Sequence, residues 1–321
     1  MNSQLSEGLW GVLATPFDEG LALDIASLRS EVESFAADGC DGLVALGVFG
    51  EAASLSADEA DEVAHAVASA SDLPFVLGLS ERDPDATVSQ ARRLIGAVPR
   101  PPVALMAQIG DADPSAAVSA LRRLYDATGI GILLQDYPVV SGITVTDEQV
   151  VSIVASCPFV VGVKSETPPT SVAIAHLAPS LDVPVFGGLG GLGLLDELTA
   201  GSAGAMTGFS HPAALAEVLA AYRDGGFRAA RDVWAPWLPL ANFEGQLRVG
   251  LAIRKEVLRR RGVVASGRVR QPARPLPATL VPLLDQHLAA LPALDQVAIE
   301  PGDVVRCELG DELASLTNPV E

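Results

Sequence analysis

Eight short apolar segments recur along the first two thirds of the chain, and they restrict the fold more than any other feature. They span residues 9–14, 42–46, 75–79, 103–106, 131–135, 160–164, 183–187 and 204–206. The segments are continuous apolar runs, which is typical of parallel strands buried on both faces. The stretches between them favour helices and include residues 24–38, 57–71, 86–95, 115–128, 147–156 and 191–200. Eight strand–helix units predict an α/β fold of the TIM (β/α)8 barrel type.

A doubly wound open sheet is the alternative α/β architecture. Such a sheet normally has a Gly-rich phosphate-binding turn after its first strand, whereas this chain continues with the sequence ATPFDEG. Two predicted helix starts support this assignment of strands and helices. Ser56 and Glu59 have the spacing of a capping box, and Asp113 precedes Pro114 at an expected first helical position.

The alternation stops near residue 212, and the remaining pattern is helical. Helices are expected at residues 211–224, 227–236, 243–261 and 277–291. We therefore expect a barrel over residues 1–224, a C-terminal helical region over 225–294 and an acidic tail over 295–321.

Charge and composition exclude several classes of function. The formal net charge is −19, so the chain is expected to repel nucleic acids and anionic membranes. The N-terminal sequence does not resemble a signal peptide, and no run of 18 apolar residues is present, which favours a cytoplasmic protein. Three cysteines and four histidines are scattered without ligand spacing, so we expect no disulfide framework, no metal and no cofactor.

Lysine is unusually rare, and one of the two lysines lies at a predicted strand end. The chain has 21 basic residues, of which only Lys164 and Lys255 are lysines. An ammonium group loses solvation inside an apolar barrel, which favours the neutral amine that can attack a ketone and form an imine. Arginine cannot take this role because it is not deprotonated in proteins. The alternative is that Lys164 reaches solvent or pairs with Glu166.

Two other strand ends carry unusual residues, and barrel enzymes place their sites at these ends. Gly47–Val48–Phe49–Gly50–Glu51 follows the second strand, and its backbone amides can form an anion-binding nest. Tyr137 lies close after the fifth strand and can move protons; the alternative is a packed aromatic residue with a hydrogen-bonded hydroxyl group.

These landmarks together resemble the dihydrodipicolinate synthase/N-acetylneuraminate lyase family of class I pyruvate-type aldolases. The similarity runs from about residue 8 to residue 291, with the GVLATPF opening, the turn 47–51 and Val161–Lys164 in register. The glycines Gly187 and Gly188 and the eighth-strand residue Met206 also match. The resemblance implies a Schiff base on Lys164, substrate contacts at 47–49, 187, 188 and 206, and a homotetramer built as a dimer of dimers.

The departures from the family pattern change the expected reaction. Val48 and Phe49 replace two threonines of the family turn, although their backbone amides can still bind a carboxylate. Gln135 stands where the family has its catalytic tyrosine, and residues 107–110 lack the second relay tyrosine. Val140 replaces an arginine that binds a second carboxylate. These changes argue against condensation with aspartate semialdehyde.

The leading hypothesis is therefore a lyase or aldolase that forms an imine between Lys164 and a pyruvate-like 2-oxo acid. Tyr137 or Gln135 would handle protons. One alternative keeps the imine but eliminates water, as a sugar-acid dehydratase does. Another is a barrel that binds a 2-oxo acid without catalysis.

Overall fold

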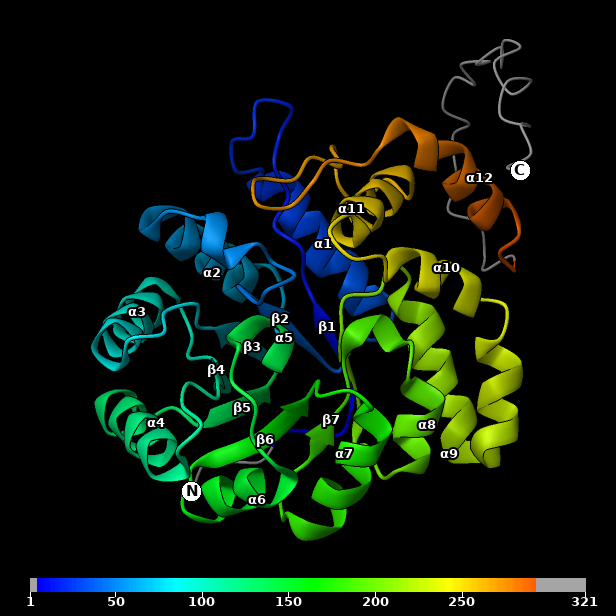
Figure 1. Ribbon diagram of the computed structural model, residues 1–321. Helices are drawn as coiled ribbons and strands as arrows, with labels where there is room; N and C mark the ends of the chain where they lie inside the picture. The colour runs from blue at the N-terminus through cyan, green and yellow to red at the C-terminus, as the bar shows by residue number, and fades with distance from the viewer. Residues whose placement is uncertain (1–4, 293–321) are drawn as a thin grey trace, which may run out of the picture.

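The computed structural model describes residues 5–292, and its centre is a barrel of eight parallel strands (Figure 1). The strands are β1 (Gly8–Val12), β2 (Gly42–Ala45), β3 (Phe75–Gly78), β4 (Ala104–Gln108), β5 (Ile132–Asp136), β6 (Val160–Ser165), β7 (Val185–Phe186) and β8 (Gly204–Thr207). Each falls on one of the eight predicted segments. Their continuous apolar character reflects burial on both sides, against the barrel interior and against the helices.

The ring of strands closes between β7 and β8. Neighbouring strands pair in the order β7-β6-β5-β4-β3-β2-β1-β8. A parallel bridge joins Gly187 to Ala205, and the Met206 amide donates to the Gly187 carbonyl at 2.9 Å. The predicted TIM barrel is thereby confirmed, and the open doubly wound sheet is wrong.

Helices surround the barrel and continue beyond it. They are α1 (Ile25–Ala37), α2 (Ala57–Ala70), α3 (Pro84–Ala97), α4 (Pro114–Thr128), α5 (Pro138–Ser141), α6 (Asp147–Ala155), α7 (Thr170–Leu177), α8 (Leu194–Thr199), α9 (Pro212–Trp234), α10 (Leu238–Glu244), α11 (Gly250–Arg260) and α12 (Val281–Ala289). Short 3-10 turns lie at η1 (Ala52–Ser54), η2 (Ala178–Ser180), η3 (Leu189–Gly191) and η4 (Ala278–Leu280).

The C-terminal helices differ in one place from the sequence expectation. The two helices expected at residues 211–224 and 227–236 are the two arms of α9, separated by a kink at Gly226, where φ is 69°. The predicted boundary after residue 224 therefore lies inside α9, two residues from that kink. Residues 243–261 are not one helix, because α10 ends at Glu244 and α11 begins at Gly250. The predicted acidic tail, 295–321, lies outside the described residues.

The helix starts follow the capping rules read from the sequence. Ser56 accepts from the Glu59 amide and the Glu59 side chain accepts from the Ser56 amide, which confirms the capping box. Asp113 caps α4, with Pro114 at the first helical position. Both caps satisfy amide groups that a helix leaves unpaired at its start.

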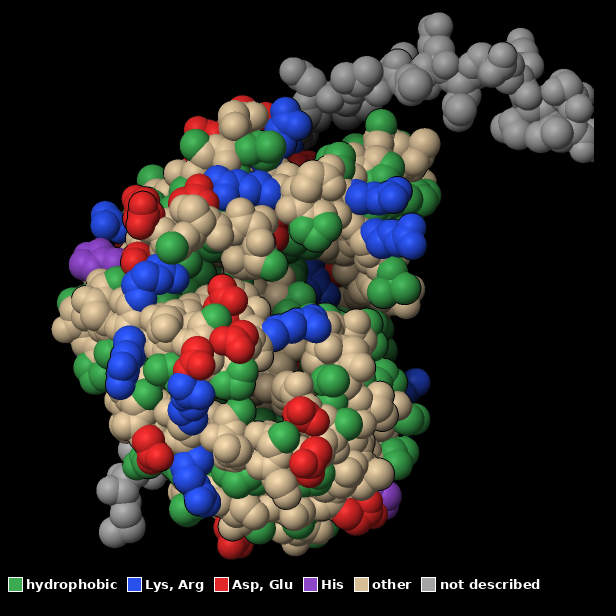
Figure 2. All heavy atoms as spheres, turned by 60° about the vertical axis from the view of Figure 1, so that its left-hand side comes forward, with side chains coloured by type: hydrophobic (Ala, Val, Ile, Leu, Met, Phe, Trp, Pro, Cys, Tyr) green, Lys and Arg blue, Asp and Glu red, His purple; other side chains and the backbone are tan. Residues whose placement is uncertain are grey.

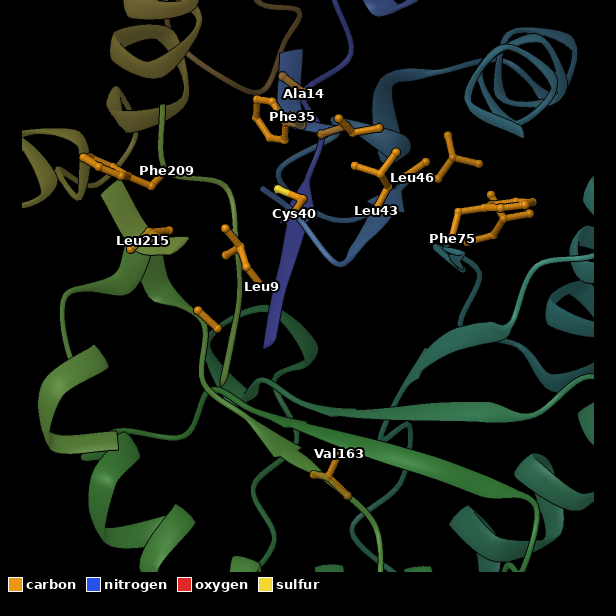
Figure 3. Close-up of a cluster of buried hydrophobic side chains, with 14 of the residues drawn as sticks. Leu9, Ala14, Phe35, Cys40, Leu43, Leu46, Phe75, Val163, Phe209 and Leu215 are labelled. Atoms are coloured by element: carbon orange, nitrogen blue, oxygen red, sulfur yellow. The ribbon is translucent and has the colours of Figure 1, made fainter. Parts of the chain in front are cut away.

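Two apolar layers hold the barrel together. An inner cluster fills the barrel and includes Trp10, Met106, Phe186 and Met206. A larger outer cluster packs the strands against the helices, and Figure 3 shows part of it, with Cys40 beside Leu9 from β1 and Leu43 from β2. Cys40 is buried and unpaired, as expected for a small apolar side chain.

The surface carries charges of both signs. Acidic and basic side chains are interspersed on the face that Figure 2 shows, with no continuous basic area there. Among residues 5–292, no helix is both long and apolar enough to cross a membrane.

The C-terminal helices lie against the early barrel elements, as Figure 1 shows for α11 and α1. The Ala265 amide donates to Ser27 of α1 at 2.9 Å, and Arg261 pairs with Asp38 at 2.9 Å. These contacts fix the end of α11 and the segment that follows it to α1.

Candidate active site

Lys164 lies in the barrel at the end of β6, as the sequence predicted. Its side chain is 7% exposed. The strand register aligns it with Gln135 of β5 and with Phe186 of β7. Val163 belongs to the outer apolar layer, so the alternation along the strand turns Lys164 inward.

A buried carboxylate accompanies the lysine. Glu166 Oε2 lies 3.2 Å from Lys164 Nζ and accepts from Gln135 Nε2 at 2.6 Å. The Glu166 side chain is 6% exposed, and its other oxygen faces the Leu189 amide at 3.4 Å. The alternative reading that Lys164 pairs with Glu166 is therefore confirmed as a contact. This pairing does not exclude chemistry, because it places a proton acceptor beside the amine.

The glycine at position 188 makes room for this carboxylate. A Cβ added there would lie 2.3 Å from Glu166 Oε1, so any larger residue would displace the carboxylate. Gly187 is equally restricted, since a Cβ there would lie 1.8 Å from a carboxylate oxygen of Glu197. The structure places both glycines around the predicted site, whereas Met206 is fully buried in the inner cluster.

The turn after β2 is shaped by two residues in the left-handed region. Leu46 has φ of 58° and Glu51 has φ of 52°. Thr15 holds the turn by donating to the Gly50 carbonyl at 2.5 Å. Within the described part of the chain, the amides of Val48 and Phe49 have no hydrogen-bond partner. The turn therefore keeps two donors available, as an anion-binding nest requires.

The second lysine anchors the same turn from the C-terminal region. Lys255 is 1% exposed and donates to Glu51, the last residue of the turn, and to the Arg268 carbonyl at 2.9 Å. Glu51 also accepts from the Arg270 amide at 2.8 Å. Burial raises the pKa of Glu51 and lowers the pKa of Lys255, since both groups lose water.

Tyr137 begins the short helix α5 and is half-buried. Burial, and to a smaller extent the nearby Glu166 charge, raises its pKa, while Arg254 acts in the opposite direction. Its hydroxyl has no hydrogen bond to any side chain or backbone group in residues 5–292. Tyr137 thus stands near the carboxylate that touches Lys164.

Arg254 of α11 reaches the same region from above the barrel. Its guanidinium carbon lies 4.8 Å from the centre of the Phe49 ring, and Nη2 would be 2.6 Å from a Cβ at Gly190. Its Nε lies 3.2 Å from Glu244, a fully buried carboxylate of α10. A cation from the C-terminal region therefore borders the loops after β2 and β7.

A further acidic residue, Asp136, lies directly after Gln135. It accepts from the Thr167 hydroxyl at 2.6 Å, and its backbone carbonyl accepts from the Glu166 amide at 2.8 Å. Burial raises the pKa of Asp136. These bonds fix the loops after β5 and β6 to each other, which holds Glu166 in place.

The described part of the chain contains no candidate metal-binding cluster. No group of three or more His, Cys, Asp or Glu side chains capable of holding a metal ion occurs in residues 5–292. His211 is buried between aromatic rings, and burial lowers its pKa to about 3.

The structure brings together, at one end of the barrel, the residues predicted from the sequence, which are Lys164, Gln135, Tyr137 and the turn 47–49. Glu166 was not predicted as a site residue. It follows β6 directly, two residues after Lys164, and continued strand-like alternation directs its side chain to the same side. Arg254 was not predicted either, because nothing in a helical repeat indicates that its side chain returns to the barrel mouth.

Comparisons with known proteins agree with this geometry. Residues 5–73 match the model of the Dihydrodipicolinate synthetase family. An L-2-keto-3-deoxyarabonate dehydratase of Azospirillum brasilense is 29% identical over 278 residues, covering 83% of this chain and 88% of the relative. A 4-hydroxy-tetrahydrodipicolinate synthase of Xanthomonas axonopodis pv. citri is 30% identical over 306 residues, covering 91% and 96%. The crystal structure of dihydrodipicolinate synthase from Rhodopseudomonas palustris superposes with a TM-score of 0.82 at 28% identity, covering 90% of this chain and 100% of that one.

Proposed function

We infer the function from the premise that this chain belongs to the dihydrodipicolinate synthetase family, whose members here include lyase-type synthases and a dehydratase. We propose that Lys164 forms an imine with the ketone of a 2-oxo acid and that the enzyme then eliminates water from carbons 3 and 4. The observation that carries this proposal is the buried Glu166 carboxylate, 3.2 Å from the Lys164 amine.

The chemistry begins at the amine. Neutral Lys164 Nζ attacks carbon 2 of the 2-oxo acid. The ketone oxygen takes one proton from the amine and one from solvent and leaves as water, which gives a protonated imine. The free amides of Val48 and Phe49 bind the carboxylate at carbon 1. The iminium group acidifies the protons on carbon 3, and Glu166 removes one of them as general base to leave an enamine.

The second half of the reaction uses the proton that Glu166 now holds. The enamine electrons expel the hydroxyl group on carbon 4 while Glu166 returns its proton to that oxygen, so water departs. Hydrolysis of the imine restores Lys164 and releases a 2-oxo acid that has lost one water and no carbon.

Replacing a tyrosine by a carboxyl group favours this elimination. An ordinary carboxyl group has a pKa of about 4 and a phenol of about 10, so the carboxylic acid is the better proton donor to a departing hydroxyl group. Aldol cleavage instead needs a base strong enough to deprotonate an alcohol, a task better suited to a phenolate. The position of the family tyrosine is occupied by Gln135, which here holds Glu166.

Aldol cleavage remains the second candidate, because Tyr137 offers a phenol. Its hydroxyl group makes no hydrogen bond within residues 5–292, and the Glu166 charge is close enough to raise its pKa. Authentic dihydrodipicolinate synthesis is not proposed. Val140 offers no cation for a second carboxylate, and its carbonyl accepts from Arg82 at 2.7 Å.

The test combines trapping with product analysis. Borohydride reduction in the presence of pyruvate is expected to label wild-type Lys164 but not the Lys164→Met variant. With 2-oxo-3-deoxy sugar acids, mass spectrometry is expected to show a product with an unchanged carbon count. Release of pyruvate with an aldehyde would instead establish aldol cleavage.

Glu166→Gln separates the two halves of the mechanism. It should keep imine trapping and lower turnover by about 10²–10⁴-fold, the usual contribution of a general acid–base group. Glu31→Gln is the matched control, because Glu31 is an equally buried carboxyl that bonds the Ala14 amide. Absence of trapping across a panel of 2-oxo acids, with affinity unchanged in Lys164→Met, would instead favour a non-catalytic binding barrel.

A further inference from the structure

Arg254 is the one residue of α11 whose guanidinium borders the loops of the candidate site. Its side chain is 12% exposed, and it lies over the Phe49 ring at 4.8 Å. Phe49 belongs to the turn proposed to bind the substrate carboxylate. The Phe49 ring also lies against Gly208, where an added Cβ would be 2.6 Å from the ring, so the ring has little room to move.

Arg254 is paired with a carboxylate on one edge only. Its Nε lies 3.2 Å from Glu244 Oε2 as an ion pair that lacks hydrogen-bond geometry. Glu244 Oε2 accepts from the Ser210 amide at 3.3 Å. Glu244 Oε1 accepts from the Ser210 hydroxyl. In the described ranges, the two terminal nitrogens of Arg254 have no hydrogen-bond partner. Glu244 therefore orients the guanidinium and leaves its outer donors unused.

The outer edge faces the barrel mouth. Nη2 approaches Gly190, in the loop that follows β7, and a Cβ there would lie 2.6 Å away. Tyr137, after β5, and Glu166, after β6, both interact electrostatically with Arg254. Loops after four different strands thus converge around one guanidinium, on the side of the barrel where Lys164 ends.

We propose that the terminal nitrogens of Arg254 bind the distal hydroxyl end of the 2-oxo acid held by Lys164. The proposal rests on the proposed function and defines its substrate class as a hydroxylated 2-oxo monocarboxylic acid. Substrate hydroxyl groups would accept from the guanidinium, while the Phe49 ring covers the carbon chain beneath it.

The local charge favours a hydroxyl group over a second carboxylate. Arg254 is already neutralised by Glu244, which is 0% exposed, and Lys164 is accompanied by Glu166. A second carboxylate would add an uncompensated buried charge beside two existing carboxylates, whereas a neutral hydroxyl group adds none.

Three 2-oxo acids that differ only in their distal end test which group Arg254 recognises. Pyruvate has no distal end, 4,5-dihydroxy-2-oxopentanoate ends in a hydroxymethyl group, and 4-hydroxy-2-oxopentanedioate ends in a carboxylate. The variants are Arg254→Met, Arg254→Lys, and the matched control Arg259→Met, which removes an arginine of the same helix that is 44% exposed and paired with Glu256.

Wild type is expected to prefer the dihydroxy acid. Arg254→Met should lower kcat/KM for that acid by roughly 10–100-fold, the range for hydrogen bonds to a charged group, and leave borohydride trapping of pyruvate unchanged. Arg254→Lys should restore part of the loss, and Arg259→Met should have no effect. A merely structural role would lower pyruvate trapping as well.

The outcomes distinguish failure of this inference from failure of the proposed function on which it rests. Failure of wild type to trap pyruvate and every other 2-oxo acid of the panel would reject the proposed function itself. Normal trapping, with Arg254→Met no worse on the dihydroxy acid than Arg259→Met, would overturn the inference alone. So would a wild-type preference for the dicarboxylate that Arg254→Met abolishes. If Arg254→Met does not fold because Glu244 is left unpaired, the double variant with Glu244→Gln is judged by the same criteria.

Discussion

Replacing Lys255 by methionine removes one partner of a buried ion pair and tests how the C-terminal region supports the site. Methionine fills a similar volume against the Phe17 ring, which lies 4.4 Å from the lysine nitrogen. Glu51 then keeps only the Arg270 amide bond of 2.8 Å, although it is 5% exposed. An uncompensated buried charge of this kind costs about 3–5 kcal/mol of unfolding free energy.

Urea unfolding at a fixed protomer concentration measures this loss, followed by the fluorescence of the buried Trp10, Trp234 and Trp237. Glu51→Gln with Lys255→Met removes both charges, so the double variant should be more stable than Lys255→Met alone. A loss below about 1 kcal/mol for Lys255→Met would refute the reasoning, since that is typical of an exposed pair.

The same variant has a predictable pH dependence. The pKa of Glu51 is already raised by burial, and removing Lys255 takes away an attraction that opposes this rise. A carboxyl group with a raised folded-state pKa binds more protons when folded, so unfolding free energy falls as pH increases through that range. Lys255→Met should therefore be least impaired in mild acid, and a loss that is the same at all pH values would contradict the assignment.

The remaining predictions concern a glycine and a second buried carboxyl. Gly188→Ala should displace Glu166, keep imine trapping, and lower turnover to a similar extent as Glu166→Gln; wild-type turnover would show that the loop yields. Burial raises the pKa of Glu31 to about 8, so wild-type unfolding free energy should fall between about pH 5 and 8. Glu31→Gln should lose this dependence in urea titrations, and parallel pH profiles of the two proteins would exclude the shift.

Periodicity was sufficient to predict the barrel because each strand is buried on both faces and each helix start has its own local signal. The eight segments and the caps at Ser56 and Asp113 needed no information from distant residues. The C-terminal region was harder. Residues 243–261 have continuous helical character, yet the chain turns sharply between α10 and α11. Arg248 has φ of 72° there, and a Cβ at Gly250 would lie 2.2 Å from the Glu244 carbonyl.

The site was predictable to the extent that strand position determines it. Lys164 was found because the end of an apolar strand specifies where its side chain points. Glu166 required one more step, because the two-residue alternation must be extended one residue beyond the end of β6, and its Gln135 contact comes from the neighbouring strand. Arg254 depends on how a separate helix docks, which no pattern within α11 specifies.

The pairing of Glu51 with Lys255 also has a consequence for how the protein matures during synthesis. The two residues are separated by 204 positions, and Arg270 and Glu59 by 211. At about 5–20 residues per second, a ribosome needs about 10–40 s to make the intervening segment. Throughout that interval the early strands can exist, and Thr15 can hold the turn that contains Val48 and Phe49, but the contacts of Lys255 and Arg270 with Glu51 are missing. A nascent barrel is therefore expected to complete the support of this turn only after α11 has emerged.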